Sequence, residues 1–290
     1  MSWRTVVIAN RAKLDYSQGC LVCRGEKTQR VHLSEIATLV IETTAVSLTS
    51  GLLCELVRHG IKVIFCDEKY NPQSELIPYC GCHDSADKLR QQLAWTSEAK
   101  RTVWAAIIKN KIYQQAELLH RLKMNEGAEL LDSYIDAGSD EDIISREGIA
   151  SRVYFINLWG TDFVRNDSTV SINLALNYGY ALILSSMNRE IVANGYIPQL
   201  GIHHIGPDNP FNLGCDLMEP FRPLVDGIVF QMNPNKFSIE EKRKLQELFQ
   251  ITVKQGGEQR YLSQVMETYA RTVFQALSEQ NTDLLQFYER

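Results

Sequence analysis

Two histidines and two carboxylates gather in one short stretch of the sequence. His203 and His204 are adjacent, and Asp216 and Glu219 follow soon after them. Because Pro210 suits the first position of a helix, Asp216 and Glu219 are expected three residues apart on one helical face. Adjacent residues of an extended segment point to opposite sides, so at most one of the two histidines is expected to join them. The pattern predicts that one imidazole and carboxylate groups converge on a cation.

This set of donors favours a hard divalent ion. One imidazole with carboxylate oxygens suits Mg²⁺ or Mn²⁺, and no thiolate is present to favour zinc. Such an ion can activate a hydroxyl nucleophile and offset charge on a pentacoordinate phosphorus, so the residues indicate phosphodiester chemistry. A non-haem iron site with two histidines and one carboxylate is the competing interpretation, and the adjacency of His203 and His204 weakens it. A histidine beside Gly and Pro can also simply cap a loop.

A third ligand must come from elsewhere, and Glu147 is the candidate. Taken alone, a carboxylate on an amphipathic helix is usually a solvated surface charge. Two carboxylates brought together without a metal repel each other, so removing Glu147 or Glu219 is expected to stabilise the metal-free protein slightly. Arg222 follows Glu219 by three residues and is expected to contact a phosphate near the metal. Arg146 is a second candidate for phosphate contact.

The cysteines allow a different metal. Cys20 and Cys23 form a C-x2-C pair, and Cys80, Cys82 and His83 make a second group, so together they could supply four zinc ligands. Cys20 and Cys23 flank two apolar residues of a strand-like run, where a free cysteine is commonly a small buried hydrophobe. We therefore expect packed thiols rather than a zinc site.

The composition limits the class of protein. A chain of 290 residues with 44% apolar and 22% charged residues can form one large or two modest domains. Its net charge of -5 argues against coating nucleic acid through bulk positive charge, so any DNA contact must use local patches. Seven cysteines, an odd number, favour a reducing compartment, and no apolar run reaches the roughly 20 residues that span a bilayer. A cytoplasmic protein without a membrane partner is expected.

The elements that position these residues fall into two groups. Short strand-like runs separated by turn residues fill residues 1–82, interrupted by a helix at 50–59 that Gly60 ends. After Asp84 the apolar residues recur at three- and four-residue steps, which predicts helices. We expect an α+β protein with a β-rich domain at 1–82 and a larger all-α catalytic, metal-binding domain at 88–290. The expected later helices are 139–159, 171–194, 210–219, 238–249 and 259–277.

Four motifs occur in an order that resembles one family. They are residues 146–150, 176–182, 201–204 and 216–223. Together with residues 4–14 they are similar to the CRISPR-associated DNA integrase family in its type II form, across essentially the whole chain. In that family a glutamate, a histidine and an acidic residue of these motifs hold the metal. The resemblance implies that Glu147, His204 and Glu219 are the catalytic residues and metal ligands, with Asp216 supporting.

The resemblance also implies partners and a reaction. It implies a homodimer formed through the β-rich domain, and two such dimers bridged by a small second CRISPR-associated adaptation protein, with other type II adaptation proteins as further partners. The expected substrate is double-stranded DNA, both the spacer precursor and the CRISPR repeat. Each 3′-hydroxyl of the precursor would attack a phosphodiester at the edge of the repeat. The alternative from another class is a non-catalytic DNA-binding scaffold.

Overall fold

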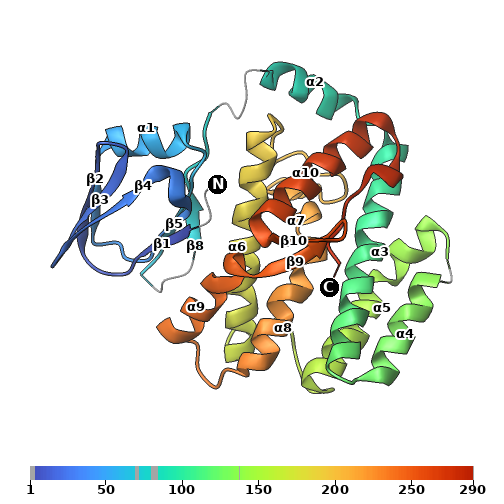
Figure 1. Ribbon diagram of the computed structural model, residues 1–290. Helices are drawn as coiled ribbons and strands as arrows, with labels where there is room; N and C mark the ends of the chain where they lie inside the picture. Colours follow the sequence, from blue (N-terminus) through green and yellow to red (C-terminus); the bar gives the residue numbers. More distant parts are fainter. Residues whose placement is uncertain (1–3, 69–71, 80–83, 137, 290) are drawn as a thin grey trace.

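Strands and helices occupy separate parts of the molecule. The computed structural model describes residues 4–68, 72–79, 84–136 and 138–289. Figure 1 shows the strands of the amino-terminal part on one side and the long helices on the other. The strands are β1 (Arg4–Ile8), β2 (Ala12–Ser17), β3 (Cys20–Arg24), β4 (Thr28–His32), β5 (Ile36–Ile41), β6 (Val46–Leu48), β7 (Lys62–Cys66), β8 (Pro72–Glu75), β9 (Thr252–Gln255) and β10 (Glu258–Tyr261).

The longer helices fill the remainder of the chain. Short 3-10 turns, among them η2 (Glu219–Phe221), connect some of them. The α-helices are α1 (Ser50–Arg58), α2 (Ser85–Ala94), α3 (Ser97–Arg121), α4 (Asn125–Asp136), α5 (Asp140–Trp159), α6 (Ser171–Ala193), α7 (Asn212–Leu217), α8 (Arg222–Met232), α9 (Ile239–Gln246) and α10 (Leu262–Glu279).

Two four-stranded sheets make up the strand-rich part. In one, with the order β1-β5-β7-β8, the first three strands are parallel and β8 is antiparallel to β7. The other has the order β4-β3-β2-β6. Every residue of β5 is buried, which is typical of a strand covered on both faces. Alternate side chains explain it, because Leu39 and Ile41 pack with the second sheet while Val40 joins the apolar core of the helices.

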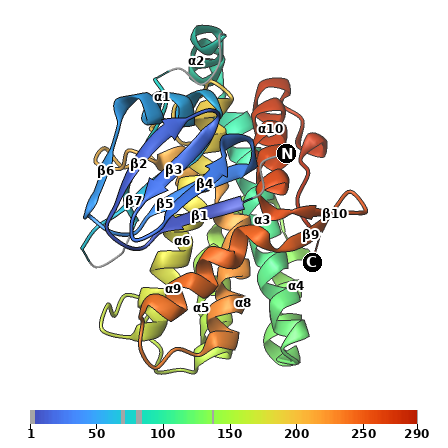
Figure 2. The ribbon, with the colours of Figure 1, turned by 60° about the vertical axis from the view of Figure 1, so that its left-hand side comes forward.

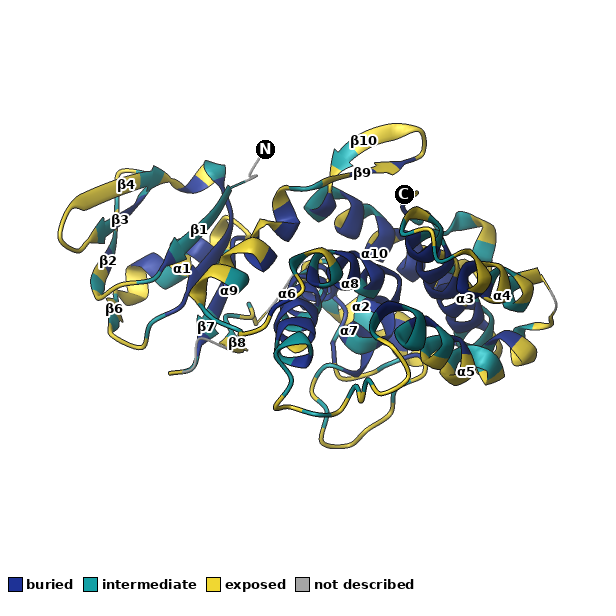
Figure 3. Cartoon of the chain, turned by 90° about the horizontal axis from the view of Figure 1, so that it is seen from below, coloured by how far each residue is buried: buried dark blue, intermediate teal, exposed yellow. Residues whose placement is uncertain are grey.

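The helical core surrounds α3 and α6. Figure 3 shows that buried residues concentrate on these helices and on the neighbouring α8 and α10, while the outer sides of α4 and α5 are exposed. Helix α3 packs against both α4 and α5. Since α3 is enclosed by several neighbours, it carries polar residues on its buried faces, including Lys111 and Gln114.

The expected fold class is confirmed, with a strand-rich part followed by a helical part. One segment departs from the all-helical expectation for 88–290, because β9 and β10 form an antiparallel hairpin where a helix was predicted to start at 259. Gly256 and Gly257 both adopt positive φ angles, +59° and +82°, and link the two strands. Such a two-residue turn matches the twist of a hairpin. Figure 2 shows the hairpin projecting beside α10.

The helix predicted for 210–219 is also shorter than expected. Helix α7 begins at Asn212 rather than at Pro210 and ends at Leu217, and η2 and α8 follow. Pro220 lacks a backbone N–H and disfavours a helical conformation in the residue before it, so one continuous helix cannot pass through. Asp216 and Glu219 therefore do not share a helical face. This break decides what each carboxylate contacts.

The two expected domains stay a prediction. Helix α2 begins at Ser85, inside the segment expected to link them. Val40, Ile64 and Cys66 of the first sheet belong to the same apolar core as the helices. In the part of the chain with assigned structure, no helix is long and apolar enough to cross a membrane.

Of the five candidate zinc ligands, the structure describes two. Cys80, Cys82 and His83 lie outside the described residues. Cys20 and Cys23 are free thiols on β3 and are half-buried.

Candidate metal centre

Two carboxylates predicted from the sequence meet at one lysine. The Nζ atom of Lys111 lies 2.5 Å from Oε1 of Glu147 and 2.7 Å from Oε2 of Glu219. Glu147 comes from α5, Glu219 from η2 and Lys111 from α3. The side chains of Lys111 and Glu219 are only 9% and 6% exposed, whereas that of Glu147 is 36% exposed. The two carboxylates thus converge on a single cationic position that opens to solvent on the Glu147 side.

Opposite charges outweigh burial in this cluster. Burial acts to raise the pKa of Glu219, but the charges of Arg222 and Lys111 lower it to about 2. Burial acts to lower the pKa of Lys111, but the charges of Glu219 and Glu147 raise it above its usual value. Arg222 donates from Nε to Oε1 of Glu219 over 2.8 Å, so each oxygen of Glu219 faces a different cation. Lys111, Glu219 and Arg222 are therefore all ionised near neutral pH.

His204 is held by Asp216, the first acidic residue of the motif at 216–223. Asp216 is completely buried and accepts hydrogen bonds from the backbone N–H groups of Ile202, His203 and His204, at 2.7, 3.1 and 3.0 Å. Its Oδ1 also lies 2.5 Å from Nδ1 of His204. Because a carboxylate accepts, Nδ1 carries the hydrogen and Nε2 is left for another partner. The hydrogen bond that His204 donates to Asp216 is the main cause that raises the pKa of His204.

Gly201 permits this close approach. A Cβ atom at Gly201 would lie 2.3 Å from the carbonyl oxygen of His204 and 2.7 Å from Oδ2 of Asp216. Any side chain there would push the loop away from the carboxylate that anchors it. The glycine before the histidines is thus explained by packing around Asp216.

Trp104 of α3 contacts both histidine rings. The ring of His203 stacks on Trp104 with a centroid distance of 4.3 Å, and that of His204 meets it edge-on at 5.8 Å. The two imidazoles are 5.6 Å apart. The expectation that they point to opposite sides is therefore wrong, because the segment is a bent loop rather than a strand. Trp104 and Lys111 are two helical turns apart, so one face of α3 supports both the histidines and the carboxylates.

A third buried carboxylate, Asp226, lies behind Arg222. Asp226 accepts hydrogen bonds from the hydroxyls of Tyr154 at 2.9 Å and Tyr180 at 2.5 Å. Burial is the main cause that raises the pKa of Asp226 to about 6. The guanidinium of Arg222 lies 4.6 Å from the centre of the Tyr180 ring, and that of Arg165 lies 5.3 Å from it. Arg222 is thus fixed between Glu219 and the face of Tyr180.

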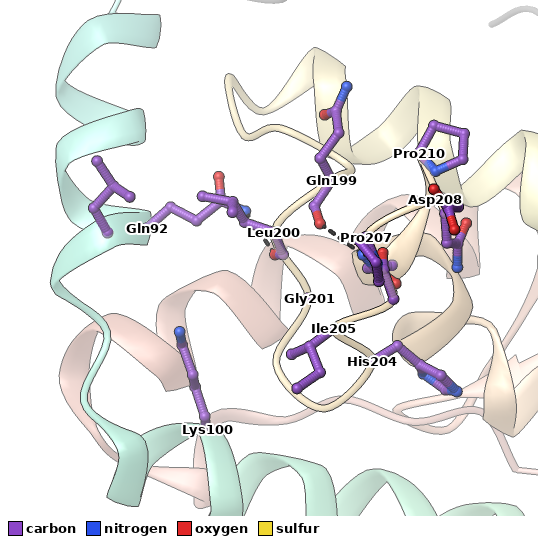
Figure 4. A pocket seen from close by; sticks show the side chains of 14 residues that line it. Gln92, Lys100, Gln199, Leu200, Gly201, His204, Ile205, Pro207, Asp208 and Pro210 are labelled. Atoms are coloured by element: carbon purple, nitrogen blue, oxygen red, sulfur yellow. Dashed lines mark hydrogen bonds between the residues drawn. The ribbon is translucent and has the colours of Figure 1, made fainter.

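A pocket of about 560 Å³ opens beside the histidine loop. Figure 4 shows Gln92 of α2 and Lys100 of α3 facing the loop residues across it. Gln92 ties α2 to this loop, because its amide donates to the carbonyls of Ile197 and Leu200 at 2.9 and 3.0 Å. His204 lies at the border of the pocket. A bound molecule in the pocket would therefore adjoin the imidazole.

The carboxylate and imidazole donors fit a hard divalent ion, although they do not all contact one position in this structure. Two carboxylates already surround a cation, and His204 presents an imidazole whose other nitrogen is fixed by Asp216. Within residues 4–68, 72–79, 84–136 and 138–289, no three His, Cys, Asp or Glu side chains stand close enough together to hold a metal ion. Glu147 and Glu219 meet at Lys111, and the charge of Glu219, after that of Asp216, contributes to raising the pKa of His204.

Comparison with known proteins identifies the family. Residues 5–267 match the family described as CRISPR associated protein Cas1. The chain is also 33% identical over 233 residues to the CRISPR-associated endonuclease Cas1 of Neisseria meningitidis serogroup C (strain 8013), covering 80% of this chain and 76% of that protein. The chain belongs to the Cas1 family. The family resemblance inferred from the four motifs is thereby confirmed.

Solved structures share the Cas1 fold. A casposase bound to an integration product has a TM-score of 0.75 and 19% identity, covering 97% of this chain and 92% of its own. A Cas1 protein from Thermotoga maritima has a TM-score of 0.71 and 13% identity, with 99% of each chain covered. These likenesses concern the arrangement of the strand-rich and helical parts.

In the structure of this chain, the predicted site residues fall into two groups. Glu147 and Glu219 meet at Lys111, and Arg222 joins them through Glu219. Asp216 and His204 form the second group. Arg146 lies apart from both, with its guanidinium 6.0 Å from the ring centre of Tyr134 on α4. The prediction that Asp216 and Glu219 face one cation is wrong, because the helix ends between them.

Three residues of this Cas1 centre were missed by the sequence analysis. They are Lys111, Trp104 and Asp226. One signal for Lys111 was present, because it lies three and four residues after the apolar residues Ile108 and Ile107 of a predicted helix. A lysine at such a position needs a buried partner of opposite charge.

Proposed function

We propose that this chain is a divalent-metal-dependent DNA endonuclease and integrase of CRISPR adaptation. It would join 3′-hydroxyl ends of short foreign DNA to the CRISPR repeat by transesterification. The observation that carries the proposal is the meeting of Glu147 and Glu219, from two distant segments, at one cationic position beside an anchored imidazole. Membership of the Cas1 family supports it.

The metal ligands in this proposal are Glu147, His204 and Glu219. Mg²⁺ or Mn²⁺ bound there would supply electrostatic stabilisation for charge that develops on the phosphate in the transition state. Asp216 holds His204 so that Nε2 remains available as a ligand. Asp216 therefore has a supporting role in this proposal.

The other side chains would bind and orient the DNA. Arg222 is 27% exposed at its side chain and can direct donors that Glu219 does not use toward a phosphate. The pocket beside His204, with Lys100 on its far side, can accept nucleotides next to the scissile phosphate. Arg146 is proposed as a more distant phosphate contact.

The reaction exchanges one phosphodiester for another. The incoming 3′-hydroxyl loses its proton, and its oxygen forms a bond to a phosphorus of the repeat while the bond from that phosphorus to the existing 3′-oxygen breaks. The released 3′-oxygen takes up a proton and becomes a free 3′-hydroxyl. The number of phosphodiester bonds is unchanged, so no external energy source and no covalent protein intermediate are needed.

The proposed assembly is a homodimer formed through the strand-rich part. Two such dimers would be bridged by the small second CRISPR-associated adaptation protein, and other type II adaptation proteins would act with them. Such an assembly can align small basic patches of several acidic chains into one track for double-stranded DNA.

Strand transfer tests the proposal directly. The protein and its small partner are incubated with a short duplex bearing 3′-hydroxyls and a supercoiled plasmid, with and without Mn²⁺. Wild-type protein should produce joined, relaxed plasmid only with the ion. Glu147→Ala, His204→Ala and Glu219→Ala should each lower the rate about a thousandfold, which corresponds to about 4 kcal/mol of transition-state stabilisation.

The matched control is a carboxylate of the same helix. Glu141 lies on the exposed surface of α5 and pairs with Arg101, so Glu141→Ala should keep full activity. DNA binding without strand transfer at any Mg²⁺ or Mn²⁺ concentration would instead identify a non-catalytic scaffold.

A further inference from the structure

Lys111 occupies the place between two proposed ligands. Its ammonium lies within 2.7 Å of an oxygen of each glutamate, and its side chain is 9% exposed. A buried ammonium is stable only with such compensation, because removing it from water is costly. The contact is therefore built into the fold of α3.

The four charges of this cluster are balanced. Glu147 and Glu219 each carry one negative charge, and Lys111 and Arg222 each carry one positive charge, so these side chains sum to zero. A divalent ion approaching a balanced cluster gains less attraction than one approaching two uncompensated carboxylates. The lysine therefore weakens the site for any ion that shares it.

The ammonium and an ion cannot use the same space. Mg²⁺ takes oxygen ligands at about 2.0–2.1 Å. Lys111 already touches the oxygens of Glu147 and Glu219 that face each other, while Arg222 uses the other oxygen of Glu219. Lysine has a long flexible stem, so its ammonium can leave while Arg222 stays in place.

We propose that Lys111 is an internal counter-ion that holds Glu147 and Glu219 together in the metal-free protein and yields its position when a divalent ion binds. This inference rests on the proposed metal site. Lys111 is a positioning residue that sets how tightly the ion binds. Before the ion arrives, Lys111 keeps the two carboxylates together. A divalent ion can occupy the site only by displacing the ammonium of Lys111.

The test is the affinity of the purified full chain for Mn²⁺, measured by calorimetry without DNA. Lys111→Met removes the charge and keeps a long unbranched side chain. Its dissociation constant for Mn²⁺ should fall about tenfold relative to wild type. Its melting temperature without metal should fall, and Mn²⁺ should raise that temperature more than it does in wild type.

Two further variants complete the test. Lys109→Met removes an exposed lysine of the same helix and should bind Mn²⁺ as wild type does. Lys111→Arg keeps the charge, so it should fold even where Lys111→Met does not, and it should bind Mn²⁺ no more tightly than wild type.

The outcomes separate this inference from the proposed function. If Lys111→Met binds Mn²⁺ with equal or weaker affinity than wild type, Lys111 is a brace for the ligands and the inference fails alone. A Mn²⁺ affinity of Lys111→Arg that exceeds the wild-type value also overturns it. If wild type itself binds no Mn²⁺, or if Glu147→Gln does not weaken binding, the proposed metal site fails and takes the inference with it.

Discussion

The two groups of the candidate centre are held together by different means. Glu147, Lys111 and Glu219 meet only through side-chain charges. The position of His204, in contrast, is fixed through backbone N–H groups that donate to the buried carboxylate of Asp216. The first arrangement can exchange one cation for another without moving the main chain. The second places the imidazole whether or not an ion is present.

The largest effect is expected from breaking the backbone-held group. Asp216→Ala leaves three backbone N–H groups of the loop without their acceptor and frees the ring of His204. Each unmade buried hydrogen bond costs about 1–3 kcal/mol, so chemical denaturation should give a loss on the order of 4 kcal/mol. Strand transfer should be lost as well.

Asp208→Ala is the control for that variant, because Asp208 is an exposed carboxylate of the same loop. It should change the free energy of unfolding by less than about 0.5 kcal/mol. Equal stabilities of Asp216→Ala and Asp208→Ala would contradict the anchoring role of Asp216.

The second largest loss of stability is expected from breaking the group that side-chain charges hold together. Glu219→Ala leaves Lys111 without its most buried partner and removes the ion pair of Arg222. The metal-free protein should lose about 3 kcal/mol of stability, since removing one partner of a buried pair leaves an uncompensated charge. This replaces the expectation that removing Glu219 is stabilising, because Lys111 prevents the repulsion on which it depended. Stability without metal, measured in the presence of a chelator, checks it, and any gain in stability would refute it.

Asp226 lies outside both groups of the candidate centre and is expected to make the stability of the protein depend on pH. Asp226 has a pKa raised from 3.8 to about 6 by burial. Its stabilising contribution is present below its unfolded value and is lost as the pH rises through about 6, because the unfolded state then releases its proton more readily. Asp226→Asn should therefore be more stable than wild type by about 3 kcal/mol at pH 7, since the pKa changes from 3.8 to about 6 on folding and each tenfold change in an acid dissociation constant corresponds to about 1.4 kcal/mol.

The difference between Asp226→Asn and wild type should shrink toward pH 4. Denaturation curves of both proteins at several pH values measure it. A difference that stays constant from pH 4 to pH 7 would show that Asp226 does not titrate in this range.

The smallest effect is expected at His203. Its ring stacks on Trp104 and is exposed, so His203→Ala removes one aromatic contact worth about 1 kcal/mol and no proposed ligand. Strand transfer should stay within about threefold of wild type, a change of about 0.7 kcal/mol in the barrier. An inactive His203→Ala beside an active His204→Ala would exchange the roles of the two histidines.

The sequence predicts the elements where a long periodic pattern has clear ends. Gly60 ends α1 as expected, and α5 and α6 lie within one residue of their predicted limits. Ser238 and Glu241 form a capping box at the start of α9, where a helix is predicted to begin. Local chemistry decides these features, so one sequence suffices to find them.

The arrangement of the site depends on contacts that no local pattern contains. Glu147 and Glu219 were found because motifs mark them, but their shared partner on α3 is distant in sequence from both. Lysine side chains are mostly exposed, and although Lys111 follows Ile107 and Ile108 at helical spacing, its two carboxylate partners become apparent only in the packed structure. Asp216 and Glu219 fall in different helices because Pro220 interrupts the helix. The three-residue spacing alone had predicted one helix through both.

The strand layer is fastened to the helices by more than apolar packing. Ser185 of α6 donates to Glu75 at 2.8 Å, Arg189 of α6 donates to the carbonyl of Ala37 at 3.1 Å, and Gln246 of α9 donates to Glu42 at 2.8 Å. With these ties and a common core, tilting the layer would strain α6, and the chain leads directly from α6 to the loop of His204. A neighbour that binds the strand layer would therefore press on α6, the helix from which the chain continues to the loop of His204.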